Sequence, residues 1–187
     1  KVVELAEGVA GPYAAMELGD GGADVVKVER LSGDRARGWG SAANKTLGSS
    51  FLGINRNKRS VAVDVESDEG AEVVRRLVKD ADVVITDAGW SQHPQLQPEA
   101  LRSLNPNLVY LSISEFGEEG PLANRPPYGE LSAQLASEAT MSLGVVGQPP
   151  VRIATDAAQM FAGIYSTQAV LAALYARDEA GGQRIDI

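Results

Sequence analysis

Short apolar runs alternate with amphipathic segments along this chain, and the alternation predicts its secondary structure. Runs rich in valine, isoleucine and leucine predict strands at residues 2–5, 25–29, 61–64, 83–86 and 108–114. Apolar residues follow one another in these runs instead of alternating with polar ones. Both faces of these strands are therefore expected to be buried, as in a parallel sheet. A further short strand is expected at residues 184–187.

Segments with helical periodicity separate the predicted strands. Helices are expected at residues 12–18, 67–79, 98–104, 129–143 and 156–177, with Ser67 as an N-cap and Pro12 in a first turn. Strands that alternate with helices at this spacing predict an α/β fold with a doubly wound parallel sheet and helices on both faces. Residues 31–50 are rich in Gly, Ser, Ala and Arg and are expected to form a long irregular loop.

Length and composition indicate one globular domain over residues 1–187. The chain starts at Lys1 on a predicted strand and ends on another, so we expect a domain truncated at both ends. It has no cysteine, which excludes disulfides and thiolate zinc sites, and no metal is expected. No uninterrupted apolar run approaches the ~18 residues of a membrane span, and no signal-peptide pattern is present. A cytoplasmic location is expected.

Charge is distributed unevenly along the chain. Residues 27–59 hold eight basic and two acidic residues, a balance of +6, whereas the whole chain carries −8. The overall negative charge argues against nucleic acid or an anionic membrane as partner. A basic window beside a predicted parallel sheet instead indicates a small molecule that carries phosphates.

The first strand is followed by Gly8 and Gly11, and Glu29 ends the second strand, which is the spacing of a dinucleotide site. The full G-x-G-x-x-G pattern is absent, and Pro12 lacks the N–H that would face a pyrophosphate. The alternative is that the two glycines only allow a tight turn into a helix.

Motifs along the whole chain resemble the class III CoA-transferases, the family that includes formyl-CoA and carnitine CoA-transferases and the α-methylacyl-CoA racemases. The matching segments include Ala10-Gly-Pro-Tyr13, Leu18-Gly-Asp20, Gly33-Asp34 with Arg37, Asn55-Arg-Asn-Lys-Arg59, Leu104-Asn-Pro-Asn107 and Gly182-Gln183. The resemblance implies a Rossmann-like large domain that binds acyl-CoA, a carboxylic acid as second substrate, and a homodimer in the full-length protein. The family's smaller second domain would lie beyond residue 187.

The resemblance also implies a use for the basic window, because CoA carries a diphosphate and a 3′-phosphate. Arg37, Arg56, Lys58 and Arg59 match the family's CoA-side segments, and Arg102 is a further candidate. The alternative for Lys58 and Arg59 is that they only solvate the start of a strand.

The family's catalytic aspartate attacks the acyl-CoA carbonyl and then forms an enzyme–CoA thioester. Direct register places Gly129 at this position, whereas one inserted residue places Glu130 there. Glu130 is the candidate nucleophile, with an ordinary helix first-turn acid as the alternative. Glu115 stands where the family has a small residue, Thr86-Asp87 replaces a Glu-Asn pair, and Tyr128-Gly129 replaces the His-Asp pair of the racemases. His93 is expected to be an ordinary surface histidine.

Three functions therefore stay open. The first is a divergent CoA-transferase, or a racemase-like enzyme of the same family. The second is a degenerate, non-catalytic domain that supports another copy in a longer chain. The third is a nucleotide-dependent oxidoreductase. The divergent acceptor-side residues do not identify the acyl group.

Overall fold

The computed structural model describes residues 1–44, 47–87, 90, 93–123, 125, 145–148 and 156–187, and it contains one six-stranded parallel sheet. The strands are β1 (Val2–Leu5), β2 (Val25–Glu29), β5 (Lys58–Ala62), β6 (Val83–Asp87), β7 (Val109–Ile113) and β8 (Arg184–Asp186). Their order is β5-β2-β1-β6-β7-β8, and every neighbouring pair is parallel. The predicted α/β fold with a doubly wound parallel sheet is confirmed.

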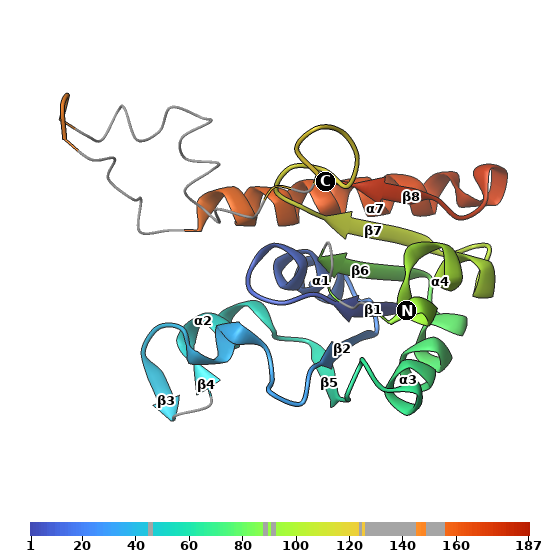
Figure 1. Cartoon of the computed structure of the whole chain (residues 1–187), viewed down its shortest axis with the longest axis horizontal. Helices are drawn as coiled ribbons and strands as arrows, with labels where there is room; N and C mark the ends of the chain where they lie inside the picture. Colours follow the sequence, from blue (N-terminus) through green and yellow to red (C-terminus); the bar gives the residue numbers. More distant parts are fainter. Residues whose placement is uncertain (45–46, 88–89, 91–92, 124, 126–144, 149–155) are drawn as a thin grey trace.

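Helices cover both faces of this sheet (Figure 1). On one face, α1 (Ala10–Asp20) and α7 (Ala157–Ala180) share an apolar core with the sheet that includes Leu18, Ile85 and Val170. On the other, α3 (Asp68–Lys79) and α4 (Pro98–Leu104) form a second core with Val74, Val84 and Leu101. Ser67 caps α3 as predicted, since its hydroxyl accepts a hydrogen bond from the Gly70 N–H at 3.0 Å. The helix predicted at residues 129–143 lies outside the described residues.

The central strands are buried on both faces, but β5 is not. It lies at the edge of the sheet and pairs with β2 alone, and Arg59, Ser60 and Ala62 are exposed or half-exposed. The expectation of burial on both faces is therefore wrong for this strand. The strand also begins at Lys58 instead of residue 61, because an edge strand accepts polar residues that a central strand would not.

The long loop expected at residues 31–50 is more ordered than predicted. It contains a 3₁₀ helix η1 (Arg35–Gly38), the short antiparallel strands β3 (Ala42–Asn44) and β4 (Leu47–Gly48), and the start of α2 (Ser49–Ile54). The Asp34 carboxylate accepts the Ala36 N–H at 2.7 Å and so caps η1. An acid two residues before Ala36 thus stabilises the first turn in a segment whose composition is typical of irregular loops.

The chain order of the strands reverses direction at the centre of the sheet. From β1 the chain builds outward through β2 to β5, and it then crosses back to build β6, β7 and β8 on the other side. The switch point therefore lies between the carboxyl ends of β1 and β6, where open α/β sheets bind their ligands. Figure 1 shows the arrowheads of β6 and β7 on the same side of the sheet. The turn after Leu5 and the last residue of β6, Asp87, meet at this place.

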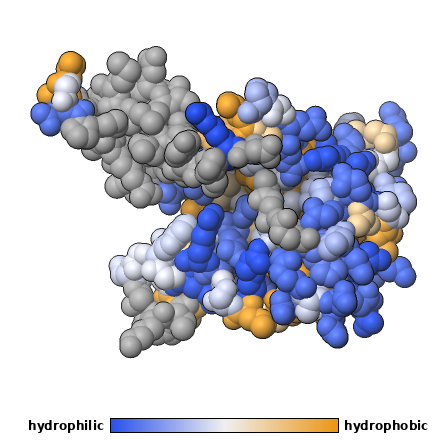
Figure 2. Space-filling model, viewed as in Figure 1, coloured by the Kyte–Doolittle hydropathy of each residue, from blue (hydrophilic) through white to orange (hydrophobic). Residues whose placement is uncertain are grey.

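Among the described residues, α7 is the one helix long and apolar enough, by length and composition alone, to cross a bilayer. Core helices of globular proteins pass the same test, so this is weak evidence for a membrane span. The helix packs against α1 and β7 through Gly163, Val170 and Ala173. Figure 2 shows that hydrophilic residues cover most of the described surface in that view.

Candidate functional site

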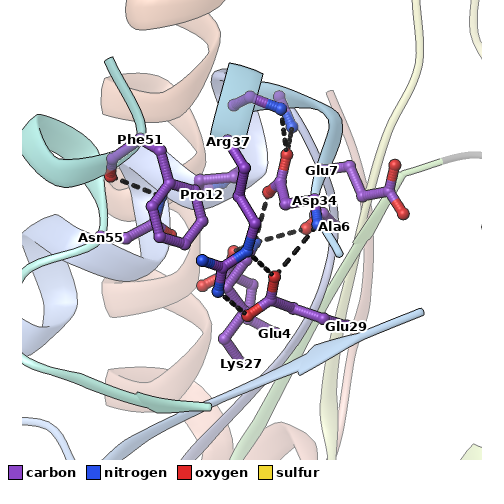
Figure 3. A network of polar contacts seen from close by, with 12 residues as sticks. Glu4, Ala6, Glu7, Pro12, Lys27, Glu29, Asp34, Arg37, Phe51 and Asn55 are labelled. Atoms are coloured by element: carbon purple, nitrogen blue, oxygen red, sulfur yellow. Dashed lines mark hydrogen bonds and ion pairs between the residues drawn. The ribbon is translucent and has the colours of Figure 1, made fainter. Parts of the chain in front are cut away.

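A buried network of charged side chains links strands β1 and β2 to Asp34 (Figure 3). The Lys27 ammonium contacts the Glu4 carboxylate at 2.6 Å, Asp34 at 2.8 Å and the Ala6 carbonyl at 2.9 Å. Burial alone would lower the pKa of Lys27, but the two carboxylates more than offset this and raise the pKa above its ordinary value. The network joins β1, β2 and the start of η1 into one unit.

Lys58 completes this network from the edge strand. Its ammonium contacts Glu4 Oε2 at 2.8 Å, the Pro12 carbonyl at 2.7 Å and Asn55 Oδ1 at 2.9 Å, and its side chain is 2% exposed. Burial lowers the pKa of Lys58 to about 8, although the charge of Glu4 acts in the opposite direction. All three donors of the ammonium are used inside the protein, so Lys58 has a structural part here, and its contact with CoA stays a prediction.

Glu29 and Arg37 form a second charged pair beside the first. Arg37 donates from Nε to Glu29 Oε2 at 2.7 Å and from Nη2 to Oε1 at 2.8 Å. The Phe51 ring lies 4.0 Å from the Arg37 guanidinium carbon, and Ser60 donates to Glu29 at 2.5 Å. Burial alone would raise the pKa of Glu29, but the hydrogen bonds from Arg37, Ser60 and the Asp34 N–H lower it to about 2. Glu29 is thus fully bonded, while Arg37 keeps a partly exposed outer edge.

The glycine turn after β1 donates its backbone N–H groups to carboxylates. Asp87 accepts the Glu7 N–H at 2.7 Å, and Asp34 accepts the Gly8 N–H at 3.0 Å. Gly8 has a φ of +83°, which confirms that it allows a tight turn. In a dinucleotide site these N–H groups would face a pyrophosphate, and Glu29 would face a ribose. The structure uses all of them internally, so it gives no support to the oxidoreductase alternative.

Asp87 is a partly buried acid at the switch point. Its carboxylate faces Gly11, since a Cβ atom on that glycine would lie 3.5 Å from Asp87 Oδ1. Burial raises the pKa of Asp87 to about 7, against the lowering effects of the Glu7 N–H and the charges of Arg35 and Lys27. A carboxyl group at this place therefore changes its charge close to neutral pH.

The other cations predicted to bind CoA lie elsewhere. Arg56 donates to Asp20 at the end of α1, and Arg59 donates from Nη2 to both carboxylate oxygens of Asp24, at 2.7 and 2.8 Å. Both acids precede β2, so these pairs lie at the amino edge of the sheet, opposite the switch point. Arg102 is exposed on α4, which packs on α3. The structure thus brings together Arg37 and Lys58 near the switch point and separates them from Arg56, Arg59 and Arg102. The contacts of all five with CoA stay predictions.

The candidate nucleophile Glu130 and its neighbour Gly129 lie outside the described residues. Glu115, which stands where the family has a small residue, follows the carboxyl end of β7 and is exposed. The description of His93 as a surface histidine is wrong. It is 8% exposed, its Nδ1 accepts the Gln95 N–H at 3.2 Å, and its Nε2 lies 3.2 Å from Asp68. Its polar neighbours in sequence concealed this burial.

Sequence reasoning missed the two acids that organise the turn. Asp34 is conspicuous in the sequence only as part of a Gly-Asp motif, yet it bonds Lys27, Gly8 and Ala36. Asp87 is conspicuous only as a departure from the family pattern, although an acid at the end of a central strand is itself a signal of a ligand site. Within the described part of the chain, no group of three or more His, Asp or Glu residues could hold a metal ion.

Comparison with known proteins assigns the chain to a family. The sequence model described as "CoA-transferase family III" matches residues 1–187, which is the whole chain. The chain belongs to CoA-transferase family III. Its resemblance to the class III CoA-transferases is thereby confirmed, and the oxidoreductase alternative is set aside.

Two named CoA-transferases and one solved structure are similar to this chain. The chain is 39% identical to succinate–glutarate CoA-transferase of Agrobacterium fabrum, covering 100% of this chain and 49% of that protein. It is 34% identical to succinyl-CoA:mesaconate CoA-transferase of Haloarcula hispanica, covering 100% of this chain and 50% of that protein. The crystal structure of a CAIB/BAIF family protein from Brucella suis superposes with a TM-score of 0.88 at 38% identity, over 98% of this chain and 50% of that one. The chain therefore spans about half the length of the relatives it matches.

Proposed function

We propose that this chain is the acyl-CoA-binding part of an enzyme that transfers CoA between carboxylic acids, with dicarboxylic acids as its substrates. The match of the whole chain to CoA-transferase family III carries the proposal. The substrate class is suggested by the relatives, which are named for succinate, glutarate and mesaconate, each an acid with two carboxyl groups.

The proposed reaction proceeds through the Glu130 carboxylate. The carboxylate attacks the acyl-CoA carbonyl and expels the CoA thiolate, which leaves a mixed anhydride. The thiolate then attacks the Glu130 carbonyl of the anhydride, so that the first acid leaves and an enzyme–CoA thioester remains. The acceptor acid reverses both steps and departs as the new acyl-CoA. No net proton or electron is consumed. The enzyme–CoA thioester is the intermediate that the two half-reactions share.

The described residues support a site for this chemistry at the switch point. Arg37 presents an outer edge beside Glu29 and Phe51, where it can bind a CoA phosphate while its inner edge stays bonded. In the glycine turn, the Glu7 and Gly8 N–H groups are already bonded to Asp87 and Asp34. We therefore propose that CoA is bound by side chains such as Arg37, and not by the backbone of a glycine loop.

A degenerate domain is the second candidate, and two observations favour it. Gly129 offers no nucleophile in direct register, and Glu115 adds an exposed negative charge after β7, where the reaction must stabilise an oxyanion. A glutamate in place of an aspartate also shifts the nucleophile by roughly an ångström, which costs on the order of a hundredfold in rate.

Mass spectrometry of the full-length protein after incubation with succinyl-CoA tests the proposal. We expect a CoA adduct on the peptide that contains Glu130, and loss of both the adduct and CoA exchange in Glu130→Gln. Glu69→Gln is the matched control, because Glu69 is an exposed first-turn helix acid, which is the alternative role for Glu130. An active protein whose activity survives Glu130→Gln would refute Glu130 as nucleophile. An inactive protein that gains activity in Glu115→Gly would establish the degenerate alternative.

A further inference from the structure

The basic window of residues 27–59 does not form a free positive surface. Acids neutralise most of its cations, and several of these acids come from outside the window. The pairs are Lys27 with Glu4 and Asp34, Arg30 with Glu7 and Glu66, Arg37 with Glu29, Arg56 with Asp20, Lys58 with Glu4, and Arg59 with Asp24. Among the window cations that the structure describes, Arg35 is the one without a carboxylate partner within ion-pair distance.

Arg35 is nevertheless held in a defined place. It is the first residue of η1 and is exposed, and its guanidinium lies against the backbone of Gly8. A Cβ atom on Gly8 would lie 2.8 Å from Arg35 Nη2 and 3.0 Å from Nε, so the absence of a side chain on Gly8 makes this approach possible. The centroid of the Trp39 ring lies 5.9 Å from the guanidinium carbon.

This place is the switch point of the sheet. Gly8 follows β1, and Asp87 ends the neighbouring strand β6. Ligands of open α/β sheets bind in the crevice outside the carboxyl ends of these two strands. Arg35 thus places an uncommitted guanidinium where the fold is expected to hold its substrate.

Two of the three acids near Arg35 are bonded to other groups. Asp34 is bonded to Lys27 and to the N–H groups of Gly8 and Ala36, and Glu7 lies 3.3 Å from Arg30. Figure 3 shows the Glu7 side chain turned away from the buried network. Asp87 is the remaining acid, and burial raises its pKa to about 7, so that it carries only part of its charge near neutral pH.

We propose that Arg35 binds the free carboxylate of a dicarboxylic acid substrate, the one that does not form the thioester. The proposal rests on the proposed function. One carboxyl group of a diacid forms the thioester. The other stays ionised, and a planar guanidinium can donate two hydrogen bonds to it. Arg35 lies on the side of η1 that faces Gly8, whereas Arg37 faces Glu29 and Phe51, so the two arginines can serve different ends of an acyl-CoA. A CoA phosphate is the other source of the same anionic chemistry.

Acceptor kinetics of the full-length protein separate these sources. Transfer from succinyl-CoA is measured to glutarate and to pentanoate, a monoacid of the same chain length, in the wild type, Arg35→Gln and Arg35→Lys. Because the two half-reactions are separate, the acceptor kcat/KM isolates the acceptor step. We expect Arg35→Gln to lower kcat/KM for glutarate about tenfold to a hundredfold more than for pentanoate, with partial recovery in Arg35→Lys. Arg76→Gln, which removes an exposed arginine of α3, is the control and should leave the ratio unchanged.

Two results would overturn the assignment. An equal loss of kcat/KM for both acceptors with a raised KM for succinyl-CoA would mean that Arg35 binds a CoA phosphate. Unchanged kcat/KM values for both acceptors would remove Arg35 from the substrate site. If the wild type transfers CoA to neither acid, the proposed function fails separately. Calorimetry of glutarate and pentanoate binding to the wild type and Arg35→Gln then decides the role of Arg35: weaker glutarate binding in the variant supports it, and equal or absent binding in both refutes it.

Discussion

Glu29 holds Arg37 through two nearly parallel hydrogen bonds, 2.7 Å from Nε to Oε2 and 2.8 Å from Nη2 to Oε1. This two-pronged geometry joins the carboxyl end of β2 to η1, and it holds the guanidinium over the Phe51 ring. Because Glu29 is 2% exposed, the pair is shielded from solvent on its carboxylate side and open on its guanidinium side.

Replacing Glu29 with Gln is expected to change the acid stability of the protein. The pKa of Glu29 falls from 4.5 to about 2 in the folded state, since the donors around it outweigh its burial. Its stabilisation is therefore fully present above pH 4.5 and is lost as the pH falls towards 2, by about 3 kcal/mol in all. Chemical denaturation at a series of pH values should show a shallower loss of stability between pH 4.5 and 2 in Glu29→Gln. An equal slope in the variant and the wild type would contradict the assignment, and Glu72→Gln, on the exposed face of α3, is the control.

The central part of the fold was predictable because its physical signals are local. Unbroken apolar runs such as Val83–Asp87 follow from burial on both faces, and Ser67 marks the start of α3 by a cap that needs only three residues. The start of the edge strand was harder to predict because it is polar: Arg59 is exposed, and the Lys58 side chain is buried through an ion pair with Glu4, which is distant in sequence. The 3₁₀ helix η1 was harder to predict, because Asp34, which caps it, is held by contacts with Gly8 and Lys27.

The candidate site was less predictable, because linear charge does not show which ions pair in the fold. The basic window predicted a free cationic surface, but Glu4, Asp20 and Asp24 approach it from outside the window and bind its cations. Arg35 differs from Arg37 only in the direction that η1 gives its side chain. The sequence could therefore locate the region that is proposed to bind an anion, but not the arginine in it that lacks a carboxylate partner.

Replacing Asp87 with Asn is expected to remove a pH-dependent change in stability. Burial raises the pKa of Asp87 from 3.8 to about 7, although Arg35 and Lys27 oppose this and Glu4 adds to it. The native state thus binds a proton that the unfolded state has lost. This contribution is fully present below pH 3.8 and disappears as the pH rises through 7. Asn keeps an acceptor for the Glu7 N–H without the charge, so Asp87→Asn should gain stability over the wild type as the pH rises from 4 to 7. Urea unfolding at each pH measures this difference in stability. Asp178→Asn is the control, because Asp178 is exposed. Parallel pH profiles for Asp87→Asn and the wild type would refute the raised pKa.

Replacing Lys27 with Met is expected to destabilise the fold strongly. The ammonium is the shared partner of Glu4 and Asp34, and its side chain is 2% exposed. Its removal leaves Asp34 without its cation and Glu4 with Lys58 alone, which costs roughly 3–5 kcal/mol for a buried pair. Denaturant titration should show this loss, whereas Lys79→Met at the end of α3 should change stability by less than about 0.5 kcal/mol. A small effect of Lys27→Met would mean that the network is not a structural centre of the domain.

The two groups of candidate CoA-binding cations can be separated by calorimetry of CoA binding to the full-length protein. We expect the Glu29→Gln/Arg37→Gln double variant to bind CoA about tenfold to a hundredfold more weakly than Glu29→Gln alone, with a reduced salt dependence. The paired design avoids leaving Glu29 buried without its partner. Arg56→Ala/Arg59→Ala should change the affinity less, because both arginines lie at the amino edge with Asp20 and Asp24. A larger loss in the latter variant would place the nucleotide at that edge instead.

Two helix glycines provide a matched test of how α7 is seated on the domain. A Cβ atom on Gly163 of α7 would lie 2.9 Å from the Ala10 carbonyl oxygen and 3.0 Å from the Tyr13 side chain, whereas one on Gly53 of α2 would meet nothing within 4 Å. Helix propensity favours alanine over glycine by up to about 1 kcal/mol at both positions. We expect Gly53→Ala to be neutral or stabilising, and Gly163→Ala to destabilise by about 1–3 kcal/mol because α1 and α7 must move apart. Thermal and urea unfolding of both variants measure the difference. Equal effects at the two positions would mean that α7 is not packed closely on α1, the helix that begins at the switch point. The candidate site would then lack the support of α7.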